Sequence, residues 1–309
     1  MVGSDWLELV FIFEYNYWPR FMRSNSKLSI NSQLQNSHKP ILKSVKKSKY
    51  ISKVPDDKGY INYNQQENQT WKKLYLRQTE IIKNRACDEF LQGLELLSMN
   101  AEAIPQLPDI NHKLNQLTGW SVERVPALIG FERFFELLAD RKFPAATFIR
   151  TPEELDYIKE PDIFHEFFGH CPLLTNQAYA DFSQHYGELG LAASKQDRAM
   201  LARLYWFTIE FGLIKTTQGL KIYGGGILSS KQECCYSLES DIPNRFSLDP
   251  IDAFRTFYRI DELQRNYFVI EQLSDLQKII KLDLISLVKQ ARELGMRPSS
   301  YEPKEDAAC

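Results

Sequence analysis

The chain has 309 residues, of which 43% are hydrophobic and 25% charged, and its net charge is −2. These values are typical of a globular protein with a substantial core, and the near-neutral charge gives no reason to expect a nucleic acid or membrane partner. Five cysteines without a CxxC pair indicate reduced thiols rather than a disulfide framework. No segment is long and apolar enough for a membrane span, and the N-terminus does not resemble a signal peptide. We therefore expect a cytoplasmic protein.

The first 55 residues differ from the rest in composition. No acidic residue lies between Tyr15 and Pro55, and lysines cluster between Lys39 and Lys53. Such a polar, basic segment buries too little apolar surface to order itself. We predict a basic, disordered N-terminal tail over residues 1–55, one catalytic domain over residues 56–295 and a C-terminal tail over residues 296–309.

Hydrophobic spacing predicts a mainly α domain with a small β-ribbon component. The expected helices, in chain order, are Asn68–Cys87, Asp88–Met99, Phe131–Asp140, Tyr179–Leu191, Met200–Lys215, Asp261–Leu273 and Leu276–Leu294. Strands are expected only at Thr147–Arg150 and Leu220–Tyr223.

Two of the five histidines, His165 and His170, lie in one aromatic segment. A zinc protease motif of the HExxH kind would need its second histidine at position 169, where the chain has Gly169. On a regular helix, side chains five residues apart point about 140° away from each other. We therefore predict that His165 ends a helix and that His170 lies just beyond it, because Gly169 permits a break and Pro172 discourages continuation.

A third metal ligand is expected from the apolar segment Leu201–Leu213, which contains Glu210. A buried, ionised carboxylate costs several kcal/mol unless it is paired or bound to a metal. Two histidines and one carboxylate form the facial triad of Fe(II) enzymes that activate dioxygen. The alternative is that Glu210 pairs with Arg203 and that each histidine only satisfies hydrogen bonds.

Further motifs accompany this pattern and resemble the pterin-dependent aromatic amino acid hydroxylases, most closely their bacterial phenylalanine 4-monooxygenase branch. They are Val125-Pro126, Leu128-Ile129, Arg150-Thr151-Pro152, Leu155-Asp156-Tyr157, Glu160–Glu166, Gly169-His170, Leu201–Leu213, Tyr223–Ser230 and Tyr258–Asp261. The resemblance runs from about Tyr60 to Leu273. It implies hydroxylation of L-phenylalanine to L-tyrosine with dioxygen, a tetrahydropterin (tetrahydrobiopterin or a bacterial analogue) and mononuclear Fe(II).

The resemblance also implies roles for single residues. The expected iron ligands, which are also the catalytic residues, are His165, His170 and Glu210. The expected substrate-binding residues are Arg150 for the carboxylate, Ser229, Trp206 and Pro161, and the expected pterin-binding residues are Phe134 and Glu166.

The chain departs from the animal members of this family at two substrate-related positions. Ile158 stands where they have a threonine, and Pro144 replaces a polar residue, so the selectivity for one aromatic side chain stays open. Hydroxylation of tryptophan by the same chemistry is the nearest alternative. A zinc hydrolase with Glu166 as base and a non-catalytic binding protein are the others. We expect a monomer, because the sequence shows neither a regulatory module nor a long C-terminal heptad helix.

Overall fold

The computed structural model describes residues 50–127 and 129–302. The first half of this part holds α2 (Gln65–Ile81), α3 (Asp88–Leu96), α4 (Leu107–Leu117), β1 (Ser121–Val125), α5 (Phe131–Ala139), β2 (Lys142–Ala146) and the 3₁₀ turn η1 (Pro152–Glu154). Next come the π-helix η2 (Phe164–His170), the 3₁₀ turn η3 (Leu173–Thr175), α6 (Gln177–Ala192), α7 (Lys195–Tyr205) and the π-helix η4 (Trp206–Glu210). The last part holds β3 (Gly212–Thr216), β4 (Gly219–Ile222), α8 (Gly225–Leu228), α9 (Lys231–Glu239), β5 (Asn244–Ser247), α10 (Pro250–Arg255), β6 (Asn266–Ile270), α11 (Asp275–Ile279) and α12 (Leu284–Leu294).

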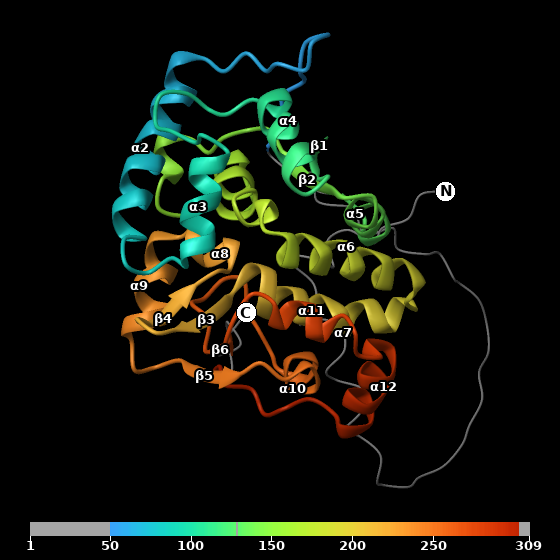
Figure 1. Cartoon of the computed structure of the whole chain (residues 1–309). Coiled ribbons are helices and arrows are strands. Elements are labelled where there is room, and N and C mark those ends of the chain that lie inside the picture. The colour runs from blue at the N-terminus through green and yellow to red at the C-terminus, as the bar shows by residue number, and fades with distance from the viewer. Residues whose placement is uncertain (1–49, 128, 303–309) are drawn as a thin grey trace, which may run out of the picture.

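Helices make up most of the domain, as predicted, and two small sheets accompany them. Strands β1 and β2 form a parallel pair, and the second sheet has the order β4-β3-β6-β5. In Figure 1 the N-terminal helices α2 and α3 lie on one side of the molecule, α6 crosses its middle, and the four-stranded sheet lies below α8. The expected β-ribbon is the antiparallel pair of β3 with β4, which contains most of the predicted strand Leu220–Tyr223.

Helix α2 begins at a capping box and supports the centre of the domain. Asn64 accepts a hydrogen bond from the backbone of Glu67, and the Glu67 side chain accepts one from the backbone of Asn64. On its buried face, the Trp71 ring meets Phe164 edge-on with ring centroids 5.5 Å apart. Phe164 is the first residue of η2, so the packing of α2 positions this π-helix.

Several predicted elements are wrong in type or extent. The predicted helix Met200–Lys215 ends at Tyr205 and continues as η4 and then β3. Gly212 begins this strand, where a Cβ would lie 2.1 Å from the Tyr223 ring. The predicted helix Asp261–Leu273 contains strand β6 instead, which is hydrogen-bonded on both sides by β3 and β5. A strand buried on both faces has a continuous apolar sequence, which cannot be told from a buried helix by periodicity.

The other differences are smaller. The predicted strand Thr147–Arg150 is not formed, and the strand β2 lies just before it. The first predicted helix ends at Ile81 rather than at Cys87, and Asn84 beyond it takes a left-handed conformation with φ 60°. The predicted helix Leu276–Leu294 is two helices, because Asp283 caps a new helix at its Ser286 backbone.

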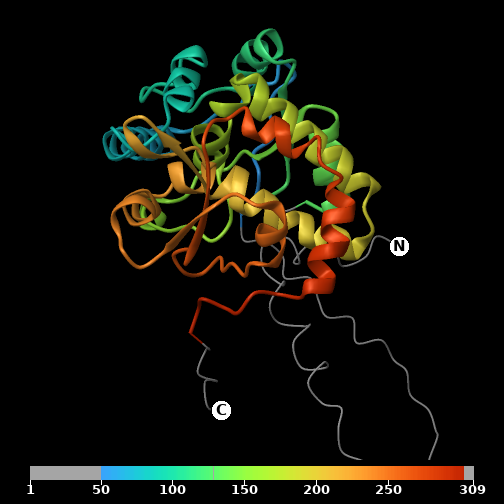
Figure 2. The same cartoon turned by 60° about the horizontal axis from the view of Figure 1, so that its bottom comes forward.

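Part of each predicted tail packs against the domain. Residues 1–49 and 303–309 lie outside the described residues, so the disorder predicted for the N-terminal tail stays a prediction. Residues 50–55, however, contact the domain, since Ser52 is buried and its hydroxyl accepts a hydrogen bond from the Thr147 backbone. Tyr301 is also buried, and in Figure 2 the chain after α12 (red) runs along the lower edge of the domain.

Two expectations about composition can be compared with the described residues. The four cysteines among them are free thiols, as expected: Cys87, Cys171, Cys234 and Cys235. Within residues 50–127 and 129–302, none of the helices has the length and apolar character that crossing a bilayer requires.

Candidate metal centre

His165 and His170 both lie within the π-helix η2, so the predicted helix end between them is wrong. A π-helix closes with hydrogen bonds between residues five apart, whereas an α-helix joins residues four apart. The Cys171 backbone N–H accordingly donates to the Glu166 carbonyl at 3.3 Å. Residues five apart therefore lie on one face of η2, and the Nε2 atoms of the two imidazoles come to 3.0 Å from each other.

Glu210 reaches the same point from the end of η4. Its Oε2 lies 3.4 Å from His170 Nε2 and 3.8 Å from His165 Nε2. The Arg203 guanidinium contacts the Ala199 carbonyl and Met200 Sδ instead, so the alternative pairing of Glu210 with Arg203 is not formed. One donor atom from each of His165, His170 and Glu210 lies within 4.8 Å of the other two.

Ser229 sets the tautomer of His165. The Ser229 hydroxyl donates to the Gly225 carbonyl at 2.9 Å and lies 3.0 Å from His165 Nδ1. Because its proton is used for the carbonyl, the hydroxyl accepts a hydrogen bond from Nδ1–H. The lone pair of the ring is then on Nε2, the atom that faces His170 and Glu210. Such an outer hydrogen bond is the usual means of orienting a metal-binding imidazole.

The glycines Gly225 and Gly226 allow α8 to lie directly against the ligands. A Cβ at Gly225 would lie 2.5 Å from His170 Nδ1, and one at Gly226 would lie 2.9 Å from Glu210 Oε2. Any larger residue would displace a ligand, because real contacts of a Cβ are longer than this. The glycine run was noted in the sequence, but its contact with the ligands depends on the tertiary structure.

The electrostatics of the three side chains suit a cation. Burial and then the charge of the neighbouring His170 together lower the pKa of His165 to about 4, so the imidazole is neutral at physiological pH. Burial opposes ionisation of Glu210, but the facing His170 and then His165 outweigh it, and the net pKa is lowered. Two imidazole nitrogen donors and one carboxylate at this spacing fit a divalent iron with a face left for other ligands.

Arg150 is buried in a bidentate pair with Asp162. Its Nε and Nη2 each donate to one carboxylate oxygen at 2.8 Å, which leaves Nη1 outside the pair. Asp162 also accepts hydrogen bonds from the backbone N–H groups of Arg150 and His165, and so ties the arginine to η2. Asp162 stands within a quoted motif, but its role was missed in the sequence because only the fold brings it to Arg150.

The remaining predicted site residues lie on elements that adjoin the ligands. Pro161 is half-buried before η2, and Trp206 is the first residue of η4. Phe134 meets Tyr205 edge-on at 5.4 Å, next to η4. Glu166 is buried on η2, where desolvation and then the charge of Glu210 raise its pKa. These roles in substrate and pterin binding stay predictions.

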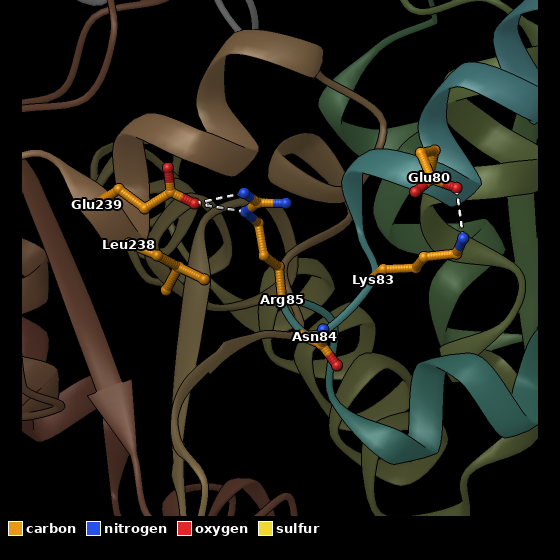
Figure 3. A pocket seen from close by; sticks show the side chains of 6 residues that line it. All are labelled: Glu80, Lys83, Asn84, Arg85, Leu238 and Glu239. Carbon is orange, nitrogen blue, oxygen red and sulfur yellow. Dashed lines mark hydrogen bonds and ion pairs between the residues drawn. The ribbon is translucent and has the colours of Figure 1, made fainter.

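A pocket elsewhere on the surface contains none of these residues. It is lined by Glu80, Lys83, Asn84, Arg85, Leu238 and Glu239 (Figure 3). Its charges are paired with each other, since Arg85 binds Glu239 at 2.6 Å and Lys83 binds Glu80. The charged side chains of this pocket therefore already neutralise one another.

Comparison with known proteins identifies the family. A family model described as biopterin-dependent aromatic amino acid hydroxylase matches residues 31–295. The chain belongs to this family. The chain is 55% identical over 263 residues to the phenylalanine-4-hydroxylase of Pseudomonas aeruginosa, and the match covers 85% of this chain and 100% of that chain.

Solved hydroxylase structures agree with the fold. The phenylalanine hydroxylase of Legionella pneumophila is 52% identical with a TM-score of 0.80, and the match covers 81% of this chain and 100% of that chain. The Chromobacterium violaceum phenylalanine hydroxylase with bound oxidised Fe(III) is 43% identical with a TM-score of 0.76, and the match covers 82% and 92%. Membership of the hydroxylase family, with iron in a relative, is inconsistent with the zinc hydrolase alternative.

Proposed function

We propose that this chain hydroxylates L-phenylalanine to L-tyrosine with Fe(II), dioxygen and a tetrahydropterin. The convergence of His165, His170 and Glu210 on one point within a biopterin-dependent hydroxylase fold carries the proposal. The relatives named phenylalanine-4-hydroxylase, at up to 55% identity, favour phenylalanine over tryptophan as the substrate. We also infer a cytoplasmic monomer.

The three ligands act by holding the metal on one side only. Bound iron and the tetrahydropterin together supply the redox chemistry that activates dioxygen. His165 and His170 bind through Nε2 and Glu210 through its carboxylate, so the opposite side stays open. Ser229 keeps the His165 ring in the tautomer that presents Nε2, and the backbone of Gly225 and Gly226 supports the ligands from behind.

The other residues bind and orient the organic reactants. Arg150 binds the substrate carboxylate through the part of its guanidinium that Asp162 leaves free, and Asp162 keeps this group rigid. Trp206 and Pro161 line the cavity for the substrate ring and exclude water from it. Phe134 stacks on the pterin. Glu166, whose pKa is raised by burial and then by the charge of Glu210, contacts the pterin through water.

Parallel assays with phenylalanine, tyrosine and tryptophan test the substrate. Each reaction contains Fe(II) and a reduced pterin, and the hydroxylated product is measured by chromatography. We expect tyrosine from phenylalanine at a kcat/KM at least about tenfold above that for tryptophan, about 1.4 kcal/mol in transition-state binding. A preference for tryptophan would overturn the substrate assignment.

The variant Glu210→Gln tests the ligand set. The amide has nearly the same shape but lacks the negative charge, so we expect iron binding to weaken at least about tenfold and turnover to be lost. The control is Glu239→Gln, which removes a carboxylate from the surface pair with Arg85. Unchanged iron content and turnover in Glu210→Gln would refute the assignment.

A further inference from the structure

The indole ring of Trp206 is held by a buried glutamine. The ring stacks against Phe211, at 4.5 Å between ring centroids, and against Tyr258, at 4.3 Å. Stacking fixes the plane of a ring but leaves it free to slide and rotate within that plane. The Trp206 Nε1–H donates to Gln264 Oε1 at 3.0 Å, and this bond sets the orientation within the plane.

Gln264 can present only its oxygen to the indole. Its Nε2 donates to the backbone carbonyls of Arg259 and Glu262, which accept but cannot donate. The side chain is 2% exposed, so water does not compete for these bonds. The amide orientation is therefore determined, and Oε1 faces two donors, the Trp206 indole and the Tyr301 hydroxyl.

Glu233 and Tyr301 keep Gln264 in place. Its backbone N–H donates to Glu233 Oε1 at 3.0 Å, and the Tyr267 hydroxyl donates to the same oxygen. Tyr301, from the segment after α12, donates to Gln264 Oε1 at 3.2 Å. The C-terminal segment thereby contacts the same oxygen that orients Trp206.

Trp206 also links this network to the metal centre through the backbone. It is the first residue of η4, and its carbonyl accepts a hydrogen bond from the Phe211 N–H at 2.8 Å. That bond encloses Glu210, the last residue of η4. The Trp206 backbone thus belongs to the turn that carries a ligand, whereas its indole ring is the part that Gln264 holds.

We propose that Gln264 is a positioning residue that fixes the Trp206 ring as a wall of the amino acid cavity, with Tyr301 supporting it. The proposal rests on the proposed function, in which Trp206 lines the substrate cavity. Without Gln264 the partly buried indole N–H lacks its acceptor, and the ring turns within the stack. The cavity then fits the substrate ring less well, while Phe134 and the pterin side are unaffected.

The test compares Gln264→Met and Tyr301→Phe with the wild type and with a matched control. Gln264→Met keeps the length of the side chain but removes the acceptor, and Tyr301→Phe removes one hydroxyl. We expect KM for phenylalanine to rise about five- to tenfold in Gln264→Met and about twofold in Tyr301→Phe, from the loss of one buried hydrogen bond. KM for the tetrahydropterin and the iron content should stay within about twofold, which general damage to the fold would not produce. The exposed Gln116→Met should change none of these values.

A double-mutant cycle with Trp206→Phe shows whether Gln264 acts through the indole. Phenylalanine has no N–H, so Gln264→Met should have little further effect on KM in that background. An equal rise in KM in both backgrounds would overturn the proposal. So would equal rises in the KM values for phenylalanine and the pterin.

Indole resonances separate this proposal from the proposed function. The chain has five tryptophans, and the indole ¹H–¹⁵N signal missing in Trp206→Phe belongs to Trp206. Loss of the hydrogen bond should shift this signal in Gln264→Met, even in protein that forms no tyrosine. An unshifted Trp206 signal would refute the positioning role, whereas absent tyrosine formation in the wild type would refute only the proposed function. If Gln264→Met does not fold, Tyr301→Phe answers the same questions, with smaller changes in the same direction.

Discussion

The contact between Gly225 and His170 allows a quantitative prediction for Gly225→Ala. A Cβ at this position would lie 2.5 Å from His170 Nδ1 and 2.6 Å from the adjacent ring carbon Cε1. The imidazole cannot simply retreat, because Phe143 packs against it with ring centroids 5.0 Å apart. Ordinary contact begins at about 3.4 Å, so the two groups must separate by about 0.9 Å.

That displacement is large for a metal ligand. Ligand distances in a working site stay within about 0.2 Å of their preferred values, so the strain cannot be absorbed at Nε2 alone. Changes next to a ligand typically weaken metal binding about 10- to 100-fold, which corresponds to about 1.4–2.7 kcal/mol. We expect Gly225→Ala to lose Fe(II) affinity in this range, with turnover falling in proportion at limiting iron.

Anaerobic equilibrium dialysis against Fe(II) measures the affinity directly, and thermal unfolding of the metal-free protein measures stability. The control is Gly219→Ala, at the first residue of β4, where φ is +103° and no atom lies within 4 Å of the added Cβ. It should cost about 1–2 kcal/mol of unfolding free energy through backbone strain and leave Fe(II) affinity unchanged. Iron affinity of Gly225→Ala within twofold of the wild type would refute the steric argument.

Two further predictions concern charge. In Arg150→Lys, an ammonium cannot span both oxygens of Asp162 and also reach the substrate. We therefore expect KM for phenylalanine to rise about tenfold and the free energy of unfolding to fall by about 1–3 kcal/mol. Steady-state kinetics and chemical denaturation measure these changes, and an unchanged KM would contradict the prediction. For the metal-free protein, the lowered pKa of His165 (about 4) means that the folded state binds fewer protons than the unfolded state between pH 4 and about 6.5. The free energy of unfolding should therefore decrease as pH falls through this window, by up to about 3 kcal/mol, and it should decrease less in His165→Gln. Thermal unfolding of both proteins from pH 7 to 4.5 measures this. An equal dependence of stability on pH in the two proteins would disprove the prediction.

Local sequence was informative where side-chain chemistry is unusual. Two histidines in an aromatic segment and one glutamate in an apolar segment have few ways to be buried without a common partner, so all three ligand candidates were identifiable. The same holds for helices with a strong apolar stripe, such as α3 and α5, whose predicted extents differ from the structure only at the C-terminal end.

Long-range pairing was not readable from sequence. The segment around Tyr267 and Phe268 is apolar on both sides, and only hydrogen bonds to β3 and β5, distant in the chain, make it a strand. The end of α7 is likewise hidden, because the apolar pattern continues through η4 into β3. In each case the deciding partner lies far along the sequence, and periodicity reports only on near neighbours.

The sequence by itself determined the donor atoms of this protein, because the chemistry of a ligand belongs to its side chain. Only the tertiary structure decided how they meet. The wider turn of η2 brings His165 and His170 to one face, and Gly225 and Gly226 let α8 approach them closely. The acceptor for the Trp206 indole comes from Gln264, 58 residues further along the chain. Backbone hydrogen bonding and close packing are properties of the whole fold, so no short stretch of sequence contains them.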